Sequence, residues 1–282
     1  MINTLWRPRP PRPRQIRALW AVPTIAALIV GGSVLVATPA SAAQPFSVCS
    51  SSNVFIGVRG TGAPGGSVES TTGNAWQIGG MGDQVAGIAD HFKNDSPYSE
   101  AWPTYVEALN YPASADLLNS ISVGVETLRE ELNHLGSACP ITPSIILAGH
   151  SQGAAVIDGV LKNPELINDR AKQQIKGVAL LGDPGHSANM PYSAMNTASN
   201  GSMFMLPSEY STINNTYRFW GWGESSQDPN PSWIPRVRDY CFTGDAACTG
   251  NFTDEGWYIH SIYTTVHPQV ISWLDYMLTN TN

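Results

Sequence analysis

Apolar residues follow two patterns along this chain. Short apolar runs and alternations, rich in β-branched residues, predict strands at residues 54–59, 104–109, 144–148 and 177–181. Apolar stripes at helical spacing predict helices at residues 81–92, 115–135, 154–161 and 268–278. Predicted strands and helices therefore alternate from about residue 54 to the C-terminus, and we expect their apolar faces to form the core.

The strand predicted at 144–148 runs through the turn Gly149-His150-Ser151-Gln152-Gly153 into the helix predicted at 154–161. A strand, a sharp Gly-x-Ser-x-Gly turn and a helix, in this order, are the context of a nucleophile elbow. A Cβ at either glycine would press on the strand or on the serine backbone, whose own dihedral angles we expect to be strained. The turn would expose the Ser151 hydroxyl and aim the Gln152 N–H, at the helix N-terminus, at an oxyanion. The alternative is a glycine-rich turn that carries a serine by chance.

A glycine-rich segment after the first predicted strand is a candidate for the other half of an oxyanion hole. In sheet-based hydrolases the second N–H donor comes from a loop after an early strand. Thr61 lies in the loop Gly60–Gly66, at the place where this donor is expected, and its hydroxyl could add a hydrogen bond. An ordinary surface loop is an equally good interpretation of the same residues.

The first 42 residues have the pattern of an export signal. Five arginines lie between Arg7 and Arg17, an apolar stretch follows from Ala18 to Val36, and Ala40-Ser41-Ala42 has the small-x-small form of a cleavage site. We expect a cleaved signal peptide at residues 1–42 and a secreted, extracellular protein. Because the apolar stretch is about long enough to cross a bilayer, an uncleaved anchor is the alternative.

Without residues 1–42 the chain is strongly acidic. It then keeps ten Lys and Arg against 22 Asp and Glu, a net charge of −12. This balance argues against nucleic acid as a partner and suits neutral substrates. Residues 43–282 contain no repeat or low-complexity tract, and their length suits one core, so we expect a single domain.

All four cysteines, Cys49, Cys139, Cys241 and Cys248, follow the predicted signal. An even count in an exported chain predicts two disulfides, for which three pairings are possible. We favour Cys49–Cys139, which closes a long loop, and Cys241–Cys248, which closes a short one. In the chain-entropy model they contribute about 4–5 and about 2–3 kcal/mol. A structural zinc site is the alternative, but the chain lacks the paired Cys-x-x-Cys or histidine cluster typical of one.

A long polar stretch at residues 187–239, rich in Ser, Asn and Pro, carries Trp220, Trp222 and Trp233. A loop of this length is usually functional or mobile. It could cover or rim a substrate cleft, where the tryptophans would offer apolar contact area. Alternatively, it is a surface excursion that buries its own tryptophans.

Asp245 and His260 complete a candidate catalytic set with Ser151. Asp245 lies inside the segment closed by Cys241 and Cys248, which would hold its carboxylate in place, and His260 follows farther along the chain. The order Ser, Asp, His is that of α/β-hydrolases. His260 would take the serine proton, and Asp245 would fix the imidazole tautomer and stabilise the imidazolium.

The six histidines leave the choice of base open when only spacing is considered. His260 is only modestly ahead of His267 and His186. His91 and His134 fall on predicted helices, and the strand-turn geometry is expected to direct the side chain of His150 elsewhere.

Three motifs in this order resemble the cutinase family of secreted serine esterases, which includes acetylxylan esterases. They are Gly149-His150-Ser151-Gln152-Gly153-Ala154, Cys241-x-x-Gly244-Asp245-x-x-Cys248 and His260-x-x-Tyr263. Arg59-Gly60-Thr61 is similar to that family's oxyanion segment, and Gly182-Asp183-Pro184 to a common strand end. The resemblance extends from about Cys49 to the C-terminus.

The resemblance implies a fold, a site and an activity. The fold is an α/β-hydrolase-type three-layer α/β/α sandwich with a small, mainly parallel sheet. Ser151 is the nucleophile, Asp245 the acid and His260 the base, Thr61 and Gln152 form the oxyanion hole, and the two favoured cysteine pairings are the family's usual ones.

The activity expected from these residues is hydrolysis of carboxylic esters through an acyl-enzyme, without a metal or another cofactor. We expect short- to medium-chain acyl esters, aliphatic polyesters or lipids as substrates, and a monomer. An acetylxylan esterase or a lipase on the same fold is an alternative, as is a non-catalytic secreted binding protein.

Overall fold

The computed structural model describes residues 47–70, 72–96, 102–188, 190–195, 197–202, 220–222 and 234–280. The predicted signal peptide at 1–42 lies outside these residues, as do Trp233 and much of the predicted excursion at 187–239. Within the part described, no helix is both long and apolar enough to cross a membrane.

Seven strands among the described residues form one sheet in the order β2-β3-β4-β1-β5-β6-β9. They are β1 (Asn53–Val58), β2 (Gly66–Glu69), β3 (Ala75–Gly79), β4 (Thr104–Leu109), β5 (Ser144–His150), β6 (Ile175–Leu181) and β9 (Val237–Tyr240). The five strands from β4 to β9 are parallel, and β2 and β3 add an antiparallel hairpin at one edge. Two further short strands, β7 (Gly221–Trp222) and β8 (Ile234–Pro235), pair with each other.

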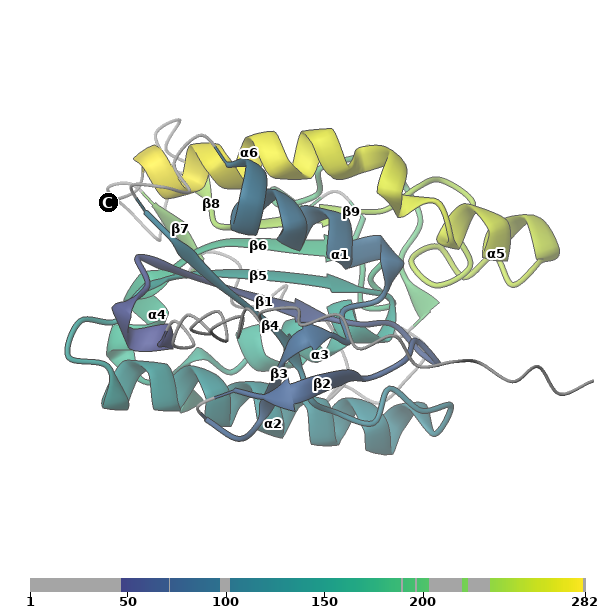
Figure 1. The fold of residues 1–282 in the computed structure, drawn as a ribbon. Helices are drawn as coiled ribbons and strands as arrows, with labels where there is room; N and C mark the ends of the chain where they lie inside the picture. Colours follow the sequence, from purple (N-terminus) through teal and green to yellow (C-terminus); the bar gives the residue numbers. More distant parts are fainter. Residues whose placement is uncertain are drawn as a thin grey trace, which may run out of the picture. The chain divides into compact units, whose positions relative to one another are not determined.

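Helices cover both faces of this sheet (Figure 1). The helices are α1 (Asp83–Asp90), α2 (Leu117–Ala138), α3 (Gln152–Leu161), α4 (Asp169–Gln174), α5 (Asp254–His260) and α6 (His267–Asn280). Single turns occur at η1 (Val48–Ser50), η2 (His91–Asp95), η3 (Pro164–Leu166) and η8 (Tyr263–Val266). α2, α3 and α4 lie on one face, and α1 and α6 lie on the other.

Side chains along the central strands point alternately to the two faces of the sheet and so form the two halves of the core. In β1, Val54 and Ile56 pack into the layer of α2 and α3, whereas Phe55 packs with α1 and α6. All six residues of β1 are buried, because a parallel strand with helices on both sides has no solvent face. This sheet between two helical layers is the α/β sandwich that the sequence predicts.

The carboxyl ends of the central strands meet at one edge of the sheet. In register, Val58 of β1 lies beside Gly149 of β5, Gly149 beside Leu180 of β6, and Leu181 beside Tyr240 of β9. The loops that leave these strands therefore start side by side, although they come from residues 59, 151, 182 and 241. Loops at this edge are where ligands bind in open α/β sheets.

The predicted strands and helices are confirmed to within a few residues, but the edge elements were missed. β2 and β3 follow the predicted loop at Gly60–Gly66, where no element was predicted, β9 falls in the predicted excursion, and α5 was not predicted. These elements are short, so hydrophobic periodicity carries little signal for them. In α2 the predicted buried stripe fails at its first turn, where Leu117 and Leu118 are 49% and 41% exposed.

Candidate active site

Ser151 connects β5 to α3 in a strained conformation. Its φ of 55° and ψ of −122° lie outside the regions that residues with a Cβ usually adopt. The turn is tight enough that a Cβ on Gly149 would lie 2.6 Å from the carbonyl oxygen of Gly153, and one on Gly153 would lie 2.1 Å from that of Val58. Both glycines are thus required by close backbone contact, as the sequence predicts for an elbow.

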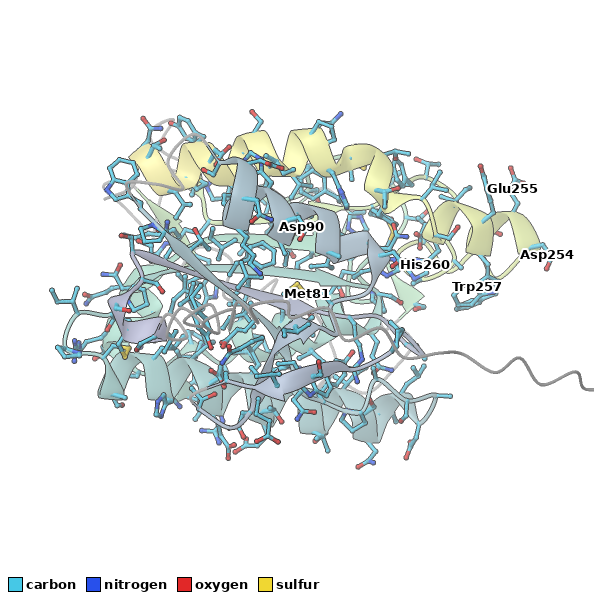
Figure 2. The ribbon with its side chains drawn as sticks, viewed as in Figure 1. Met81, Asp90, Asp254, Glu255, Trp257 and His260 are labelled. Atoms are coloured by element: carbon cyan, nitrogen blue, oxygen red, sulfur yellow. A yellow bond between two sulfur atoms is a disulfide. The ribbon has the colours of Figure 1, made fainter. Side chains whose placement is uncertain are left out.

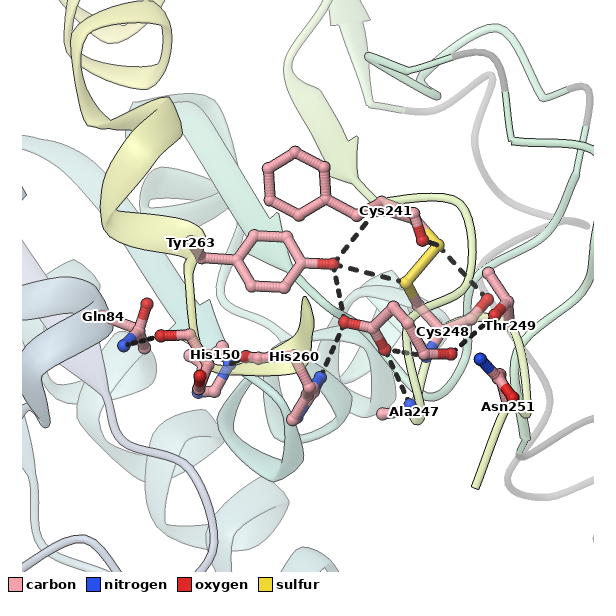
Figure 3. A network of polar contacts seen from close by, with 12 residues as sticks. Gln84, His150, Cys241, Ala247, Cys248, Thr249, Asn251, His260 and Tyr263 are labelled. Atoms are coloured by element: carbon pink, nitrogen blue, oxygen red, sulfur yellow. Dashed lines mark hydrogen bonds and ion pairs between the residues drawn. A yellow bond between two sulfur atoms is a disulfide. The ribbon is translucent and has the colours of Figure 1, made fainter. Parts of the chain in front are cut away.

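The carboxylate of Asp245 lies in a fully buried cradle closed by a disulfide (Figure 3). Cys241 is bonded to Cys248, and the backbone N–H groups of Ala247 and Cys248 donate to Asp245 Oδ1 at 2.7 and 2.8 Å. The Tyr263 hydroxyl donates to Oδ2 at 2.9 Å. Tyr263 stands in the sequence as part of the motif His260-x-x-Tyr263, and in the structure it completes this cradle.

His260, the last residue of α5, is hydrogen-bonded to that carboxylate. The distance from its Nδ1 to Asp245 Oδ2 is 2.8 Å, and both side chains are buried. Burial alone would raise the pKa of Asp245, but the bonds from His260, Cys248 and Tyr263 favour the ionised form and hold the pKa below its ordinary value. An ionised Asp245 accepts the proton on Nδ1, which leaves Nε2 as the basic nitrogen of a neutral ring.

The imidazole of His260 lies next to the elbow. Ser151 N–H donates to the carbonyl of Leu181 at 2.9 Å, and a Cβ on the next residue, Gly182, would lie 2.9 Å from Cε1 of His260. Among the described residues, Nε2 of His260 has no hydrogen-bond partner, so it is not bonded to the Ser151 hydroxyl in this structure. The structure therefore pairs His260 with Asp245. Ser151 lies close to this pair, because it bonds to Leu181 and the next residue, Gly182, lies against the His260 ring.

The expectation for His150 was wrong. Its ring does not point away from the site but lies against His260, with ring centroids 4.6 Å apart and planes inclined by 33°. Figure 3 shows the two rings side by side. The turn at Ser151 reverses the chain so sharply that the side chain before it faces the loop bearing the base, which the strand pattern alone could not indicate.

The other two candidate bases have different partners. The ring of His186 forms a buried hydrogen bond with Asp239 of β9, and Nε2 of His267 bonds to the carbonyl of Gln84 at 2.9 Å. Neither histidine is bonded to Asp245.

The Gln152 side chain joins the elbow to the loop that carries Thr61. Its Nε2 donates to the Thr61 hydroxyl at 3.2 Å and to the Ser114 carbonyl at 2.9 Å, while its Oε1 accepts from Ser120 at 2.7 Å. As the first residue of α3, Gln152 has a backbone N–H without an acceptor inside the helix. Thr61 and Gln152, the two oxyanion donors that the sequence predicts, thus lie together beside Ser151.

The buried side chain of Arg59, part of the motif Arg59-Gly60-Thr61, supports this loop. The guanidinium of Arg59 donates to the carbonyls of Ala63 at 2.9 Å and Leu109 at 3.2 Å, and also to that of Tyr111. The Tyr111 hydroxyl returns a bond to the Arg59 carbonyl at 2.6 Å. Burial lowers the pKa of Arg59 from its usual value, and the carbonyl acceptors compensate for lost hydration.

Both disulfides favoured by the sequence are present, because Cys49 is also bonded to Cys139. Trp220, from the predicted excursion, is 1% exposed and donates from its indole to the Leu161 carbonyl at 2.8 Å. This residue is therefore a core anchor and not part of a cleft rim. The described residues contain no group of three or more His, Cys, Asp or Glu that could hold a metal ion.

Comparisons with known proteins identify a family for this chain. A sequence family described as Cutinase matches residues 48–277. The chain is 28% identical over 198 residues to phospholipase Culp4 of Mycobacterium tuberculosis, covering 66% of this chain and 78% of that protein. It is 31% identical over 146 residues to carboxylesterase Culp1 of Mycobacterium bovis, covering 51% and 52%.

Two solved structures show the same fold at low identity. The catalytic core domain of acetyl xylan esterase from Trichoderma reesei superposes with a TM-score of 0.56 at 18% identity, covering 80% of this chain and 98% of that one. A cutinase-like protein from Cryptococcus sp. has a TM-score of 0.56 at 20% identity, covering 82% and 97%.

Proposed function

Because this chain belongs to the cutinase family, we propose that it is a secreted serine esterase that hydrolyses short- to medium-chain acyl esters or aliphatic polyesters through an acyl-enzyme. The strongest support is the buried His260–Asp245 hydrogen bond beside a serine held at a φ of 55°. An ionised carboxylate, an imidazole and a strained serine at the carboxyl edge of one sheet are the parts of a nucleophilic hydrolase.

In the proposed reaction the Ser151 hydroxyl attacks the ester carbonyl while Nε2 of His260 accepts its proton. The imidazolium is stabilised by Asp245, whose carboxylate is held by four donors. The N–H groups of Thr61 and Gln152 bind the oxyanion of the tetrahedral intermediate. The alcohol leaves with the proton from His260, and water then releases the acid from Ser151 by the same route.

Apolar side chains near these residues suit an acyl chain. Trp257 is 50% exposed and meets the His260 ring edge-on, with centroids 5.6 Å apart. Figure 2 shows Trp257 and His260 on α5. Leu117 and Leu118, also exposed, begin the helix that carries Ser120, the partner of Gln152. Side chains of this kind contribute binding energy in proportion to the apolar area that the substrate covers.

Active-site labelling tests the assignment of the nucleophile. A p-nitrophenyl phosphonate should inactivate the protein and leave its adduct on Ser151. Ser151→Ala should lose labelling and about a million-fold in kcat, by analogy with other serine hydrolases. Ser137→Ala, which changes an exposed serine at the far end of α2, is the matched control and should label normally. Unchanged ester turnover by Ser151→Ala would exclude this mechanism, and absence of ester turnover in the unaltered protein would favour a binding protein.

A chain-length series separates the proposed substrates. We expect turnover of p-nitrophenyl butyrate and octanoate and release of acid from a polyester film. Hydrolysis of p-nitrophenyl acetate and acetylated xylan alone would instead assign an acetylxylan esterase. Release of fatty acid from phospholipid vesicles would extend the activity to lipids, the class named for the relative Culp4.

Secretion is tested separately from catalysis. Expression of the full chain in a host that exports proteins should give a culture-medium product whose N-terminus is Ala43. A product retained in the membrane with residues 1–42 attached would establish the anchor instead.

A further inference from the structure

His150 links the nucleophile to the backbone of the base. Its Nε2 bonds to the carbonyl oxygen of His260 at 2.9 Å, across 110 residues of sequence. Its ring also packs on the His260 ring and lies 5.6 Å, centroid to centroid, from the ring of Tyr263. One side chain thus contacts the base and a member of the cradle that holds Asp245.

The acceptor of this bond fixes the state of His150. A carbonyl oxygen only accepts, so Nε2 must carry the proton and Nδ1 is bare in the neutral ring. The pKa of His150 is lowered to about 4, because the ring is buried and lies beside His260. The titratable groups that face it are His260, Asp245 and Tyr263. The bond to the His260 carbonyl and the charge of Asp245 favour the charged ring, but burial and the His260 ring outweigh them. His150 therefore stays neutral while His260 cycles between imidazole and imidazolium.

The bond also anchors the end of a helix. His260 is the last residue of α5, and the final carbonyls of a helix have no partner farther along it. The loop that carries Thr61 packs against the same ring, since a Cβ on Gly60 would lie 3.0 Å from Nδ1 of His150 and 3.3 Å from Cβ of Ser151. The elbow, the end of α5 and the loop that carries Thr61 therefore meet at this side chain.

We propose that His150 is a positioning residue that sets the distance between the Ser151 hydroxyl and Nε2 of His260, by tying the elbow to the carbonyl of the base. This inference rests on the proposed function, because it takes Ser151 as nucleophile and His260 as base. Without the bond, the end of α5 is free to shift relative to the elbow. A misplacement of about 1 Å can cost about 100-fold in rate, so the expected loss is catalytic and not one of substrate affinity.

Two substitutions separate the hydrogen bond from the bulk of the ring. His150→Phe keeps an aromatic ring but removes the donor, and we expect kcat on p-nitrophenyl butyrate and the rate of phosphonate labelling to fall together, by about 10- to 100-fold, with KM within twofold. His150→Gln offers an N–H at a similar reach and should recover most of that loss. His267→Phe, which removes a matching ring-to-carbonyl bond of 2.9 Å to Gln84, should lower thermal stability but leave kcat within twofold.

A measurement on the unaltered protein does not depend on the folding of any variant. Proton–nitrogen NMR of ¹⁵N-histidine-labelled protein should show His150 as the neutral Nε2–H tautomer from pH 5 to pH 8. A proton on Nδ1 in this range would overturn the proposal. So would an unchanged kcat in His150→Phe, or His150→Gln as slow as His150→Phe. Ser151→Ala distinguishes failure of this proposal from failure of the proposed function. Ester turnover by that variant would contradict the serine-esterase mechanism itself, whereas the outcomes above contradict only the role of His150.

Discussion

Replacing Tyr263 with Phe removes one hydroxyl from the middle of the Asp245 cradle. That hydroxyl donates to Asp245 Oδ2 at 2.9 Å and accepts from the Phe242 N–H at 3.1 Å, and Tyr263 is fully buried. The ring itself, which packs on Phe242 and His260, is retained. The variant therefore tests the two hydrogen bonds with little change in packing.

The expected loss follows from the two partners. A hydrogen bond to a charged group contributes about 1.5–3 kcal/mol, and a buried N–H left without an acceptor costs about 1–3 kcal/mol. The free energy of unfolding should fall by about 2.5–6 kcal/mol, or Tm by about 5–24 °C for a domain of this size. The N–H groups of Ala247 and Cys248 still hold Oδ1, so we expect Asp245 to stay in place and kcat to fall only about tenfold.

Thermal unfolding and p-nitrophenyl butyrate kinetics measure the two effects side by side. Tyr105→Phe is the matched control, because the Tyr105 hydroxyl is also buried but has no hydrogen-bond partner in the part of the chain that the structure describes. Its removal should change Tm by less than about 2 °C and leave kcat unaltered. Equal Tm values for the two variants would refute the energetic value assigned to the cradle, and an unchanged kcat in Tyr263→Phe would refute its part in orienting the base.

Three further predictions concern the elbow, the buried Asp183 and the short disulfide. Gly153→Ala should unfold the elbow or abolish activity, because the new Cβ would lie 2.1 Å from the Val58 carbonyl oxygen. The same change in an open helix would add about 1 kcal/mol of stability. A variant with wild-type circular dichroism and turnover would contradict the elbow geometry. Burial, and next the charge of Asp239, raise the pKa of Asp183 to about 8, so the native state keeps a proton that the unfolded chain loses above about pH 4, and stability falls as pH rises through this window. At pH 7 the protonation of Asp183 lowers the free energy of unfolding by about 4 kcal/mol. Asp183→Asn should therefore have a higher Tm than wild type at pH 8 but not at pH 4. An equal dependence of Tm on pH in the two proteins would show that Asp183 is not buried as an acid. Reduction of Cys241–Cys248 should inactivate the protein by loosening the Asp245 cradle, and full activity with both thiols free by mass spectrometry would oppose this.

The sequence by itself determined the features that depend on neighbours along the chain. The strands at 54–59, 144–148 and 177–181 and the long helices follow from hydrophobic periodicity, which records which faces are buried wherever the segment lies. The elbow is equally local, because glycines on either side of a serine between a strand and a helix leave few other conformations. Enclosure of Asp245 by a short disulfide loop could also be predicted, since the two cysteines are only seven positions apart.

Only the tertiary structure decided which distant side chains meet. Spacing left His260, His267 and His186 as candidate bases, and the folded segment after β9 brings His260, not the other two, to the carboxylate of Asp245. The turn at Ser151 places His150 against the base, in a direction opposite to our expectation. These contacts join residues that are far apart along the chain, and a sequence pattern with a period of a few residues carries no information about a contact that spans 110 residues.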